Sequence, residues 1–312
     1  MLAALLTTVM FSVSAVCGSR SARILGGTEA HFWRLLLAVL LLAIYAHAFG
    51  QALATNALGW FVVSGCVGFG IGDVALFQAL PRIGSRLSIL LVTCFSAPMA
   101  AVMEWGWLGT RMTRMEILCA TVILGGVSVA LLPRENPHVP AGRLAAGILA
   151  GLIAAFCQGY GAVLSRKAFE EAAGAGEFID GMTAAYQRTL GGLLVTAVCL
   201  LLVKRRSVWS KCSGAWLETR EERLAKTDLW KSVWPWVVLN GVAGPALGVS
   251  CFQWALKTTP TGIVLPIVAL TPVVIIPFAW YWEKERPNVR SLAGVVVAVA
   301  GAVALARVAS GG

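Results

Sequence analysis

The chain has 312 residues, of which 58% are hydrophobic and only 13% are charged, and its mean hydropathy is +0.79. A soluble domain carries about 25% charged residues, so this composition excludes a soluble globular protein and indicates an integral membrane protein. The net charge of +10 does not indicate a nucleic-acid partner, because the sequence contains no basic soluble module that would hold one.

Apolar runs recur along the chain with short polar breaks, and each is long enough to cross a hydrocarbon core about 30 Å thick. They predict an all-α integral membrane protein with ten transmembrane helices. The predicted spans are residues 2–17, 33–49, 58–79, 87–108, 115–132, 144–163, 184–203, 234–256, 262–282 and 292–308. The first span has no Lys or Arg before Arg20, whereas a signal peptide begins with a basic region. We therefore expect an uncleaved first span.

The loops differ in their content of Lys and Arg, which marks cytoplasmic loops. The odd-numbered loops hold 17 of these residues, and the even-numbered loops with the C-terminal tail hold 6. This count predicts that both termini lie outside and that the long loop 204–233 is cytoplasmic. Within that loop, residues 214–231 mix Trp and Leu with charges, and Thr219 and Glu222 have the spacing of a capping box. We interpret this segment as a short amphipathic helix on the membrane surface, or alternatively as a solvated linker.

The sequence offers no metal or cofactor site. Its eight cysteines form no CxxC pair, and its three histidines, His31, His47 and His138, are far apart. We therefore expect no cofactor.

Two halves of the chain are similar to each other. A shift of 176 residues aligns three glycines of the third span with three of the eighth: Gly65, Gly68 and Gly72 with Gly241, Gly244 and Gly248. We predict two five-span repeats, 1–133 and 143–308, joined by a linker at 134–142. Because five is odd, the second repeat is inverted relative to the first, an arrangement that permits alternating access around a site near the bilayer midplane.

The repeated glycines and the prolines inside spans have structural interpretations of their own. Gly68 with Gly72, and Gly244 with Gly248, form GxxxG pairs that let helices approach closely in lipid, so spans 3 and 8 are candidates for the contact between the halves. Prolines inside spans free backbone carbonyls next to protein or a wet cavity, or simply kink the helix for packing. The hinge candidates are Pro98, Pro245, Pro266 and Pro272.

These features together resemble a ten-span EamA-type transporter of the drug/metabolite transporter superfamily. The resemblance rests on the paired helix starts FWRLLLAVLLL and YQRTLGGLLV, on GFGIGDVALFQALPRIG and on GVAGPALGVSCFQWALKTTP. The sequence departs from the family pattern at Thr110, where an acidic residue is usual, while the second half keeps Glu285. The resemblance implies secondary transport of small metabolites, often outward, through a cavity lined by spans 1, 3, 4, 6, 8 and 9. It also implies cytoplasmic termini, contrary to the loop count, and we expect a bacterial plasma (inner) membrane protein.

Asp73 lies deep within the third span, where a charge is expensive and usually faces a cavity or a partner. Because burial favours the uncharged acid, Asp73 is our candidate site for a proton or a cationic substrate. The alternatives are a protonated Asp73 that bonds a neighbouring helix, or an ion pair with Arg34. The aligned residue of the second half is Val249, so the halves differ here. Glu104, beside Trp105, is expected to extend to the membrane surface.

Other polar residues inside spans are candidates to line a substrate cavity, although each could equally tie two helices together. They are Arg34, Gln78, Gln158, Tyr160, Arg188, Asn240, Gln253 and Thr271. The predicted function is a secondary transporter, with a small solute and the lipid bilayer as partners; monomer and homodimer both stay open. A non-transporting scaffold or partner protein is the alternative, and an intramembrane enzyme is disfavoured because the acids and histidines are isolated.

Overall fold

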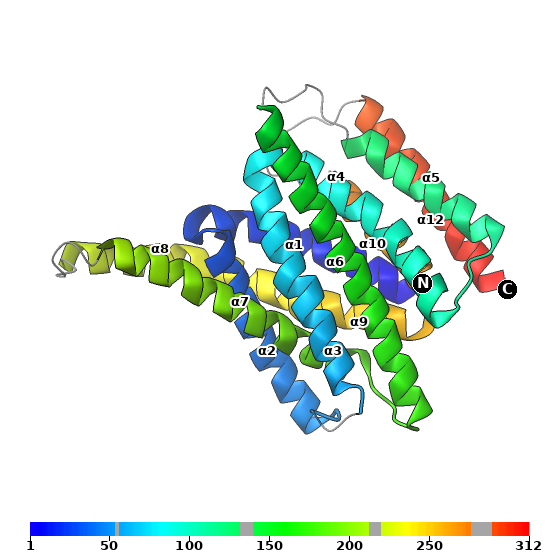
Figure 1. Cartoon of the computed structure of the whole chain (residues 1–312), viewed down its shortest axis with the longest axis horizontal. Coiled ribbons are helices and arrows are strands. Elements are labelled where there is room, and N and C mark those ends of the chain that lie inside the picture. The colour runs from blue at the N-terminus through cyan, green and yellow to red at the C-terminus, as the bar shows by residue number, and fades with distance from the viewer. Residues whose placement is uncertain (54–55, 132–139, 212–219, 276–288, 312) are drawn as a thin grey trace.

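The computed structural model describes residues 1–53, 56–131, 140–211, 220–275 and 289–311, and every element in this part of the chain is a helix (Figure 1). The helices are α1 (Leu2–Leu25), α2 (Gly27–Ala48), α3 (Leu58–Gly65), η1 (Cys66–Gly72), α4 (Asp73–Leu108), α5 (Arg114–Leu131), α6 (Ala141–Gly174), α7 (Gly181–Lys211), α8 (Arg220–Gly241), η2 (Val242–Gly248), α9 (Val249–Thr258), α10 (Thr261–Val268) and α12 (Val289–Gly311).

The described residues contain nine helical segments long and apolar enough to cross a membrane, and a shorter apolar one at Thr261–Ile275. The prediction of an all-α membrane protein with ten spans is thereby confirmed. The predicted spans 58–79 and 87–108 correspond to Leu58–Leu80 and Leu87–Leu108. The predicted ninth span runs on to residue 282, and its end lies outside the described residues, as do Glu285 and most of the linker 134–142.

The first two helices are longer than predicted. α1 continues through the polar residues after position 17 to Leu25, and α2 begins at Gly27 rather than at residue 33. Gly26, between them, has a φ of 84°, a left-handed value that glycine adopts without steric strain, so the chain can turn sharply between the two helices within one residue. The polar end of α1 is helical because it packs on α8, where the Arg20 guanidinium lies 4.3 Å from the centre of the Trp236 ring.

The region of the long loop is also more helical than predicted. α7 continues to Lys211, and α8 is helical from Arg220 through the start of the eighth span (Figure 1). The helix predicted within 214–231 is therefore present from residue 220 onward, but it is longer than expected because it continues directly as α8. Its position on the membrane surface stays a prediction. Thr219, the first residue of the proposed capping box, lies outside the described residues.

Two π-helices interrupt the bundle, η1 before α4 and η2 before α9. They begin at Cys66 and Val242, 176 residues apart, which is the shift that aligns the repeated glycines. π-helical turns are rare and occur frequently at functional sites. The division of the chain into two repeats stays a prediction, and the matching positions of η1 and η2 support it.

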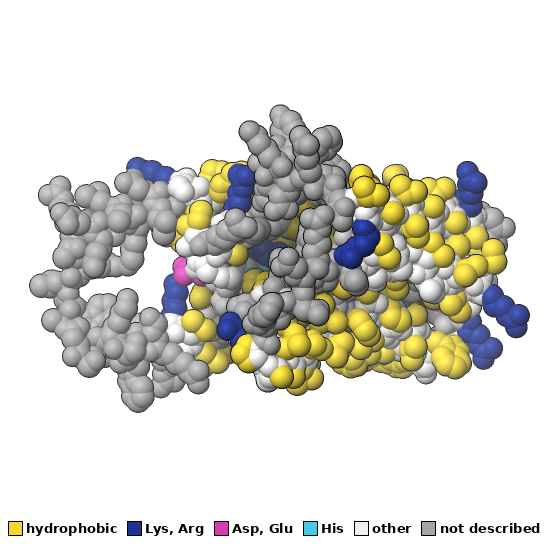
Figure 2. All heavy atoms as spheres, turned by 90° about the horizontal axis from the view of Figure 1, so that it is seen from above, with side chains coloured by type: hydrophobic (Ala, Val, Ile, Leu, Met, Phe, Trp, Pro, Cys, Tyr) yellow, Lys and Arg dark blue, Asp and Glu magenta, His cyan; other side chains and the backbone are white. Residues whose placement is uncertain are grey.

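The predicted repeats interlock through spans 3 and 8. α3 and η1 pack against α6 and α7, while α8 and η2 pack against α1 and α2. A Cβ atom at Gly68 would lie 2.9 Å from Nη2 of Arg188, and one at Gly248 would lie 2.7 Å from the Phe11 ring. The small residues therefore permit these approaches. Figure 2 shows hydrophobic side chains over much of the described part of one face, between scattered Lys and Arg side chains, as lipid contact requires.

Candidate functional site

An ion pair lies inside the bundle where η1 ends. Asp73, the first residue of α4, is 5% exposed. Its Oδ2 accepts a hydrogen bond of 2.9 Å from Nη2 of Arg34 on α2 and lies 3.2 Å from Nε2 of His31. Its Oδ1 lies 3.5 Å from Nε2 of Gln158 on α6. Of the alternatives that the sequence left open for Asp73, the structure shows the pair with Arg34 and adds Gln158 from the second predicted repeat.

His31 connects the two partners of this ion pair, and its tautomer follows from its neighbours. Nε of Arg34, which can only donate, lies 2.9 Å from Nδ1 of His31, so Nδ1 accepts and carries no proton. The ring proton is therefore on Nε2, which faces both Asp73 and the carbonyl oxygen of Phe69 at 3.2 Å. His31 is thus neutral and holds Arg34 and Asp73 in register. The sequence analysis passed over His31, although His31 and Arg34 have the i, i+3 spacing that places them on one face of a helix.

A second polar cluster surrounds Arg188 of α7. Arg188 is 1% exposed, and its Nη1 lies 3.5 Å from Oγ of Ser165. Ser165 also receives a hydrogen bond of 3.1 Å from Nε2 of Gln253 on α9 and lies 2.8 Å from Oγ of Ser64. Nε of Arg188 and Oε1 of Gln253 are buried without a hydrogen-bond partner among the residues that the structure describes. Within the described part of the chain, no carboxylate lies within 4 Å of the Arg188 guanidinium.

The two clusters meet at Phe69 of η1. Its ring centre lies 4.9 Å from Cζ of Arg188, and its carbonyl oxygen faces His31. The ring of Phe252 lies 5.4 Å from the same guanidinium, so aromatic faces provide part of the stabilisation that a buried cation needs. Phe69 of η1 therefore contacts both polar clusters, the one around Asp73 through its backbone and the one around Arg188 through its ring.

Glu104 corrects the sequence analysis. We expected it to extend to the membrane surface, but it is 2% exposed and its Oε1 accepts a hydrogen bond of 3.1 Å from Nε of Arg166 on α6. Its Oε2 accepts from the backbone N–H of Thr261 at 2.7 Å and from the Thr261 hydroxyl. A carboxylate at the N-terminus of α10 also interacts favourably with the helix dipole. Glu104 therefore joins α4, α6 and α10.

The remaining candidates lie apart from these clusters. Gln78 is exposed and accepts a hydrogen bond of 2.7 Å from Arg82 on its own helix. Asn240 accepts from Ser14 at 2.6 Å and ties α8 to α1. Tyr160 packs with Trp107 and Phe156, and Thr271 donates to the carbonyl of Val268. Among the hinge candidates, Pro245 lies in η2, Pro98 and Pro266 line a pocket described below, and Pro272 follows a break after α10.

Comparison with known proteins agrees with this architecture. Residues 1–132 and 145–307 match the EamA-like transporter family. The chain belongs to this family. The resemblance found in the sequence is thereby confirmed, and the protein is a membrane transporter of the drug/metabolite transporter type.

The sequence relatives of this EamA-type transporter match only part of its chain. It is 33% identical over 89 residues to a probable 4-amino-4-deoxy-L-arabinose-phosphoundecaprenol flippase subunit ArnE of Pseudomonas paraeruginosa, which is 27% of this chain and 75% of the relative. The corresponding protein of Pseudomonas aeruginosa strain UCBPP-PA14 is 34% identical over the same shares. A solved crystal structure matches 99% of this chain and 97% of its own with a TM-score of 0.74 and 17% identity, which shows a shared fold.

No three His, Cys, Asp or Glu side chains gather in the described residues where they could hold a metal ion. Among the described residues, the site consists instead of the ion pairs Asp73–Arg34 and Glu104–Arg166, whose carboxylates are buried, and of the buried Arg188, which has no carboxylate in contact. Such a set can bind a charged solute, exchange a proton or hold two helices together, and it lies where the predicted repeats meet.

Proposed function

We propose that this EamA-type protein is a secondary transporter of the bacterial plasma membrane that exports a small organic solute by alternating access between its two repeats. The observation that carries the proposal is the cluster around Asp73. A buried carboxylate is expensive in a membrane and is kept where it serves a pathway or a partner. Here it contacts α2 of one repeat and Gln158 of the other, so movement of the repeats changes its surroundings.

Two contacts of buried carboxylates with α6, one polar and one ionic, lie at different depths and suit such a movement. Along α6, Gln158 contacts Asp73 and Arg166 binds Glu104. Eight residues of α-helix separate these positions, a rise of about 12 Å. Rocking of one repeat can open the contact at one level while the contact at the other level stays closed, as alternating access requires.

Arg188 suggests which solutes fit. It is a buried cation whose Nε has no acceptor in the part of the chain that the structure describes, and burial of an unpaired charge is costly. A solute with a carboxylate or phosphate group would supply the missing acceptor. We therefore propose an anionic or zwitterionic solute that binds Arg188. Asp73 would release Arg34 when Asp73 takes up a proton or binds a cationic group of the solute.

A screen followed by reconstitution tests the proposal. Cells expressing the wild type, Asp73→Asn or Glu171→Gln are grown on matched pairs of toxic carboxylates or phosphates and their uncharged analogues, with protein levels checked in the membrane fraction. Glu171 is the control because it is an exposed carboxylate paired with Lys167. We expect the wild type and the control to protect against charged members of the panel, and Asp73→Asn to protect less.

Solutes identified in this way are then followed as labelled compounds in liposomes containing the purified protein, with and without a pH gradient. If Asp73→Asn leaves every identified transport activity and its pH dependence intact, Asp73 has no role in coupling. If the purified wild-type protein moves none of these solutes, a scaffold or partner function is favoured.

Movement of a lipid-linked solute is a second candidate function, favoured by the names of the ArnE relatives. In liposomes, it predicts that a labelled polyprenyl-phosphate sugar changes leaflet only when the wild-type protein is present. Failure of that assay, together with transport of a water-soluble solute, would separate the two candidates.

A further inference from the structure

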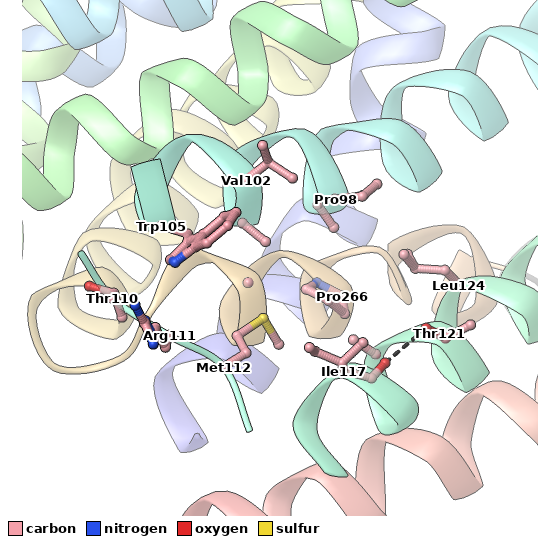
Figure 3. A pocket seen from close by; sticks show the side chains of 14 residues that line it. Pro98, Val102, Trp105, Thr110, Arg111, Met112, Ile117, Thr121, Leu124 and Pro266 are labelled. Atoms are coloured by element: carbon pink, nitrogen blue, oxygen red, sulfur yellow. Dashed lines mark hydrogen bonds between the residues drawn. The ribbon is translucent and has the colours of Figure 1, made fainter. Parts of the chain in front are cut away.

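A pocket of about 490 Å³ lies between α4, α5 and α10 (Figure 3). None of its described lining residues belongs to the cluster around Asp73. Most of its wall is apolar, and the side chains drawn there include Pro98, Val102, Ile117, Leu124 and Pro266. Val102 and Ile117 are largely exposed to the surroundings of the helices. In a membrane-spanning bundle, those surroundings are hydrocarbon.

One end of the pocket is polar. Figure 3 shows Trp105, Thr110 and Arg111 together at this end, with the indole nitrogen of Trp105 directed toward the other two. None of the three has a hydrogen-bond partner among the residues that the structure describes. Among the described residues, no Asp or Glu lines the pocket, so no carboxylate of this part of the chain balances the charge of Arg111 there. The pocket is thus amphipathic along its length.

The position of α5 keeps this space open. α5 packs tightly on α12, where Gly126 lies against Ala298 and Gly294 against Ala130. The contact is on the side of α5 away from the pocket, so α5 is held as part of a helix pair. On the pocket side, Met112 lies against Gly262 at the beginning of α10, so the chain after α4 forms part of the pocket wall.

We propose that this pocket binds one acyl chain of an anionic phospholipid, with the lipid phosphate held by Arg111, Thr110 and Trp105. A hydrocarbon chain matches the apolar wall, and a phosphate supplies the acceptors that the three donors lack. Trp and Arg side chains of this kind occur where helices meet the headgroup layer. A soluble anion would leave the apolar wall unused, and a neutral lipid would leave the charge of Arg111 unused.

Native mass spectrometry of the purified full chain tests this site. The protein is titrated with phosphatidylglycerol, with diacylglycerol of the same chains, and with inorganic phosphate. We expect one tightly retained phosphatidylglycerol and much weaker retention of the other two. Arg111→Ala should weaken phosphatidylglycerol binding by about tenfold or more, because it removes a charge-assisted hydrogen bond. Arg114→Ala, at an exposed arginine outside the lining, is the matched control and should change little.

A second pair of variants tests the tail. Val102→Trp places a ring at an exposed lining position and should abolish the tight adduct, whereas Val129→Trp, exposed on α5 but outside the lining, should retain it. Thermal unfolding shows that each variant is folded. Independently of any variant, phosphatidylglycerol with a photoreactive tail should crosslink within residues 97–124. Equal affinities of Arg111→Ala and Arg114→Ala, equal binding of diacylglycerol, or crosslinks only elsewhere would overturn the proposal. None of these results would bear on Asp73.

Discussion

The ion pair between Glu104 and Arg166 gives the sharpest test of how the predicted repeats are held together. The substitution Glu104→Gln keeps the shape of the side chain and removes its charge. In the wild type, one oxygen of Glu104 accepts from Arg166 and the other accepts twice from Thr261. Glutamine has one oxygen and one NH2 group, so a donor of either Arg166 or Thr261 must face another donor.

The size of the effect follows from burial. The side chain of Glu104 is 3% exposed and that of Arg166 is 15% exposed, so the substitution leaves a nearly buried arginine without its anion. Removing one partner of a buried ion pair costs about 3–5 kcal/mol. At roughly 2–4 °C per kcal/mol for a large domain, we expect the unfolding midpoint to fall by about 6–20 °C.

The measurement is thermal unfolding in detergent, followed by tryptophan fluorescence. Glu171→Gln, which breaks an exposed i, i+4 pair with Lys167, is the control. It should shift the midpoint by no more than about 4 °C, because solvent screens exposed pairs. The double variant Glu104→Gln with Arg166→Met removes both charges and should be more stable than Glu104→Gln alone. A midpoint of Glu104→Gln equal to that of the control, or a double variant with purely additive losses, would refute this reasoning.

Two further predictions concern packing and orientation. Gly65→Ala should strongly lower the unfolding midpoint, because the new Cβ would overlap the carbonyl of Arg188 and force α3 away from α7. Gly59→Ala, at a glycine that faces open space, is the control and should be tolerated. Similar midpoints for the two variants would contradict the close approach of α3 and α7. Cys212, in the loop 204–233 of the sequence, should resist an impermeant thiol reagent in intact cells and react after the cells are opened. Cys212→Ser is the blank for this labelling. Labelling of Cys212 in intact cells would reverse the orientation predicted from the loop charges.

Hydropathy predicts the spans because each must remove its own apolar side chains from water, a property local to the sequence. The ends are less predictable from sequence because they depend on partners. Residues 18–25 resemble a polar loop, yet they continue α1, because Arg20 packs its guanidinium on the Trp236 ring of α8. Similarly, charged residues after 220 look separate from the eighth span but belong to one helix with it.

The candidate site shows the same division between local and distant information. Asp73 and Arg34 stand out because charges within apolar runs are rare. Glu104 lies near the end of a span beside a tryptophan, a position where an extended side chain is the natural expectation. Its partner Arg166 is 62 residues away, and no periodicity within the sequence relates the two. His31 was missed because an isolated histidine near the end of a span indicates nothing until Arg34 and Phe69 are known to flank it.

The asymmetry between the halves has an energetic consequence. Arg34 and Arg188 occupy corresponding positions in the predicted repeats, but Asp73 corresponds to Val249, which is fully buried. One carboxylate therefore stands near two arginines. It pairs directly with Arg34, while Phe69, whose carbonyl oxygen faces His31, stacks its ring on Arg188. A proton or a cationic group that neutralises Asp73 removes the counter-charge of Arg34, whereas Arg188 has no carboxylate in contact among the described residues. Since the two arginines belong to different predicted repeats, we expect a change at this one buried carboxyl group to alter the balance between the repeats, which is the coupling that the proposed alternating access needs.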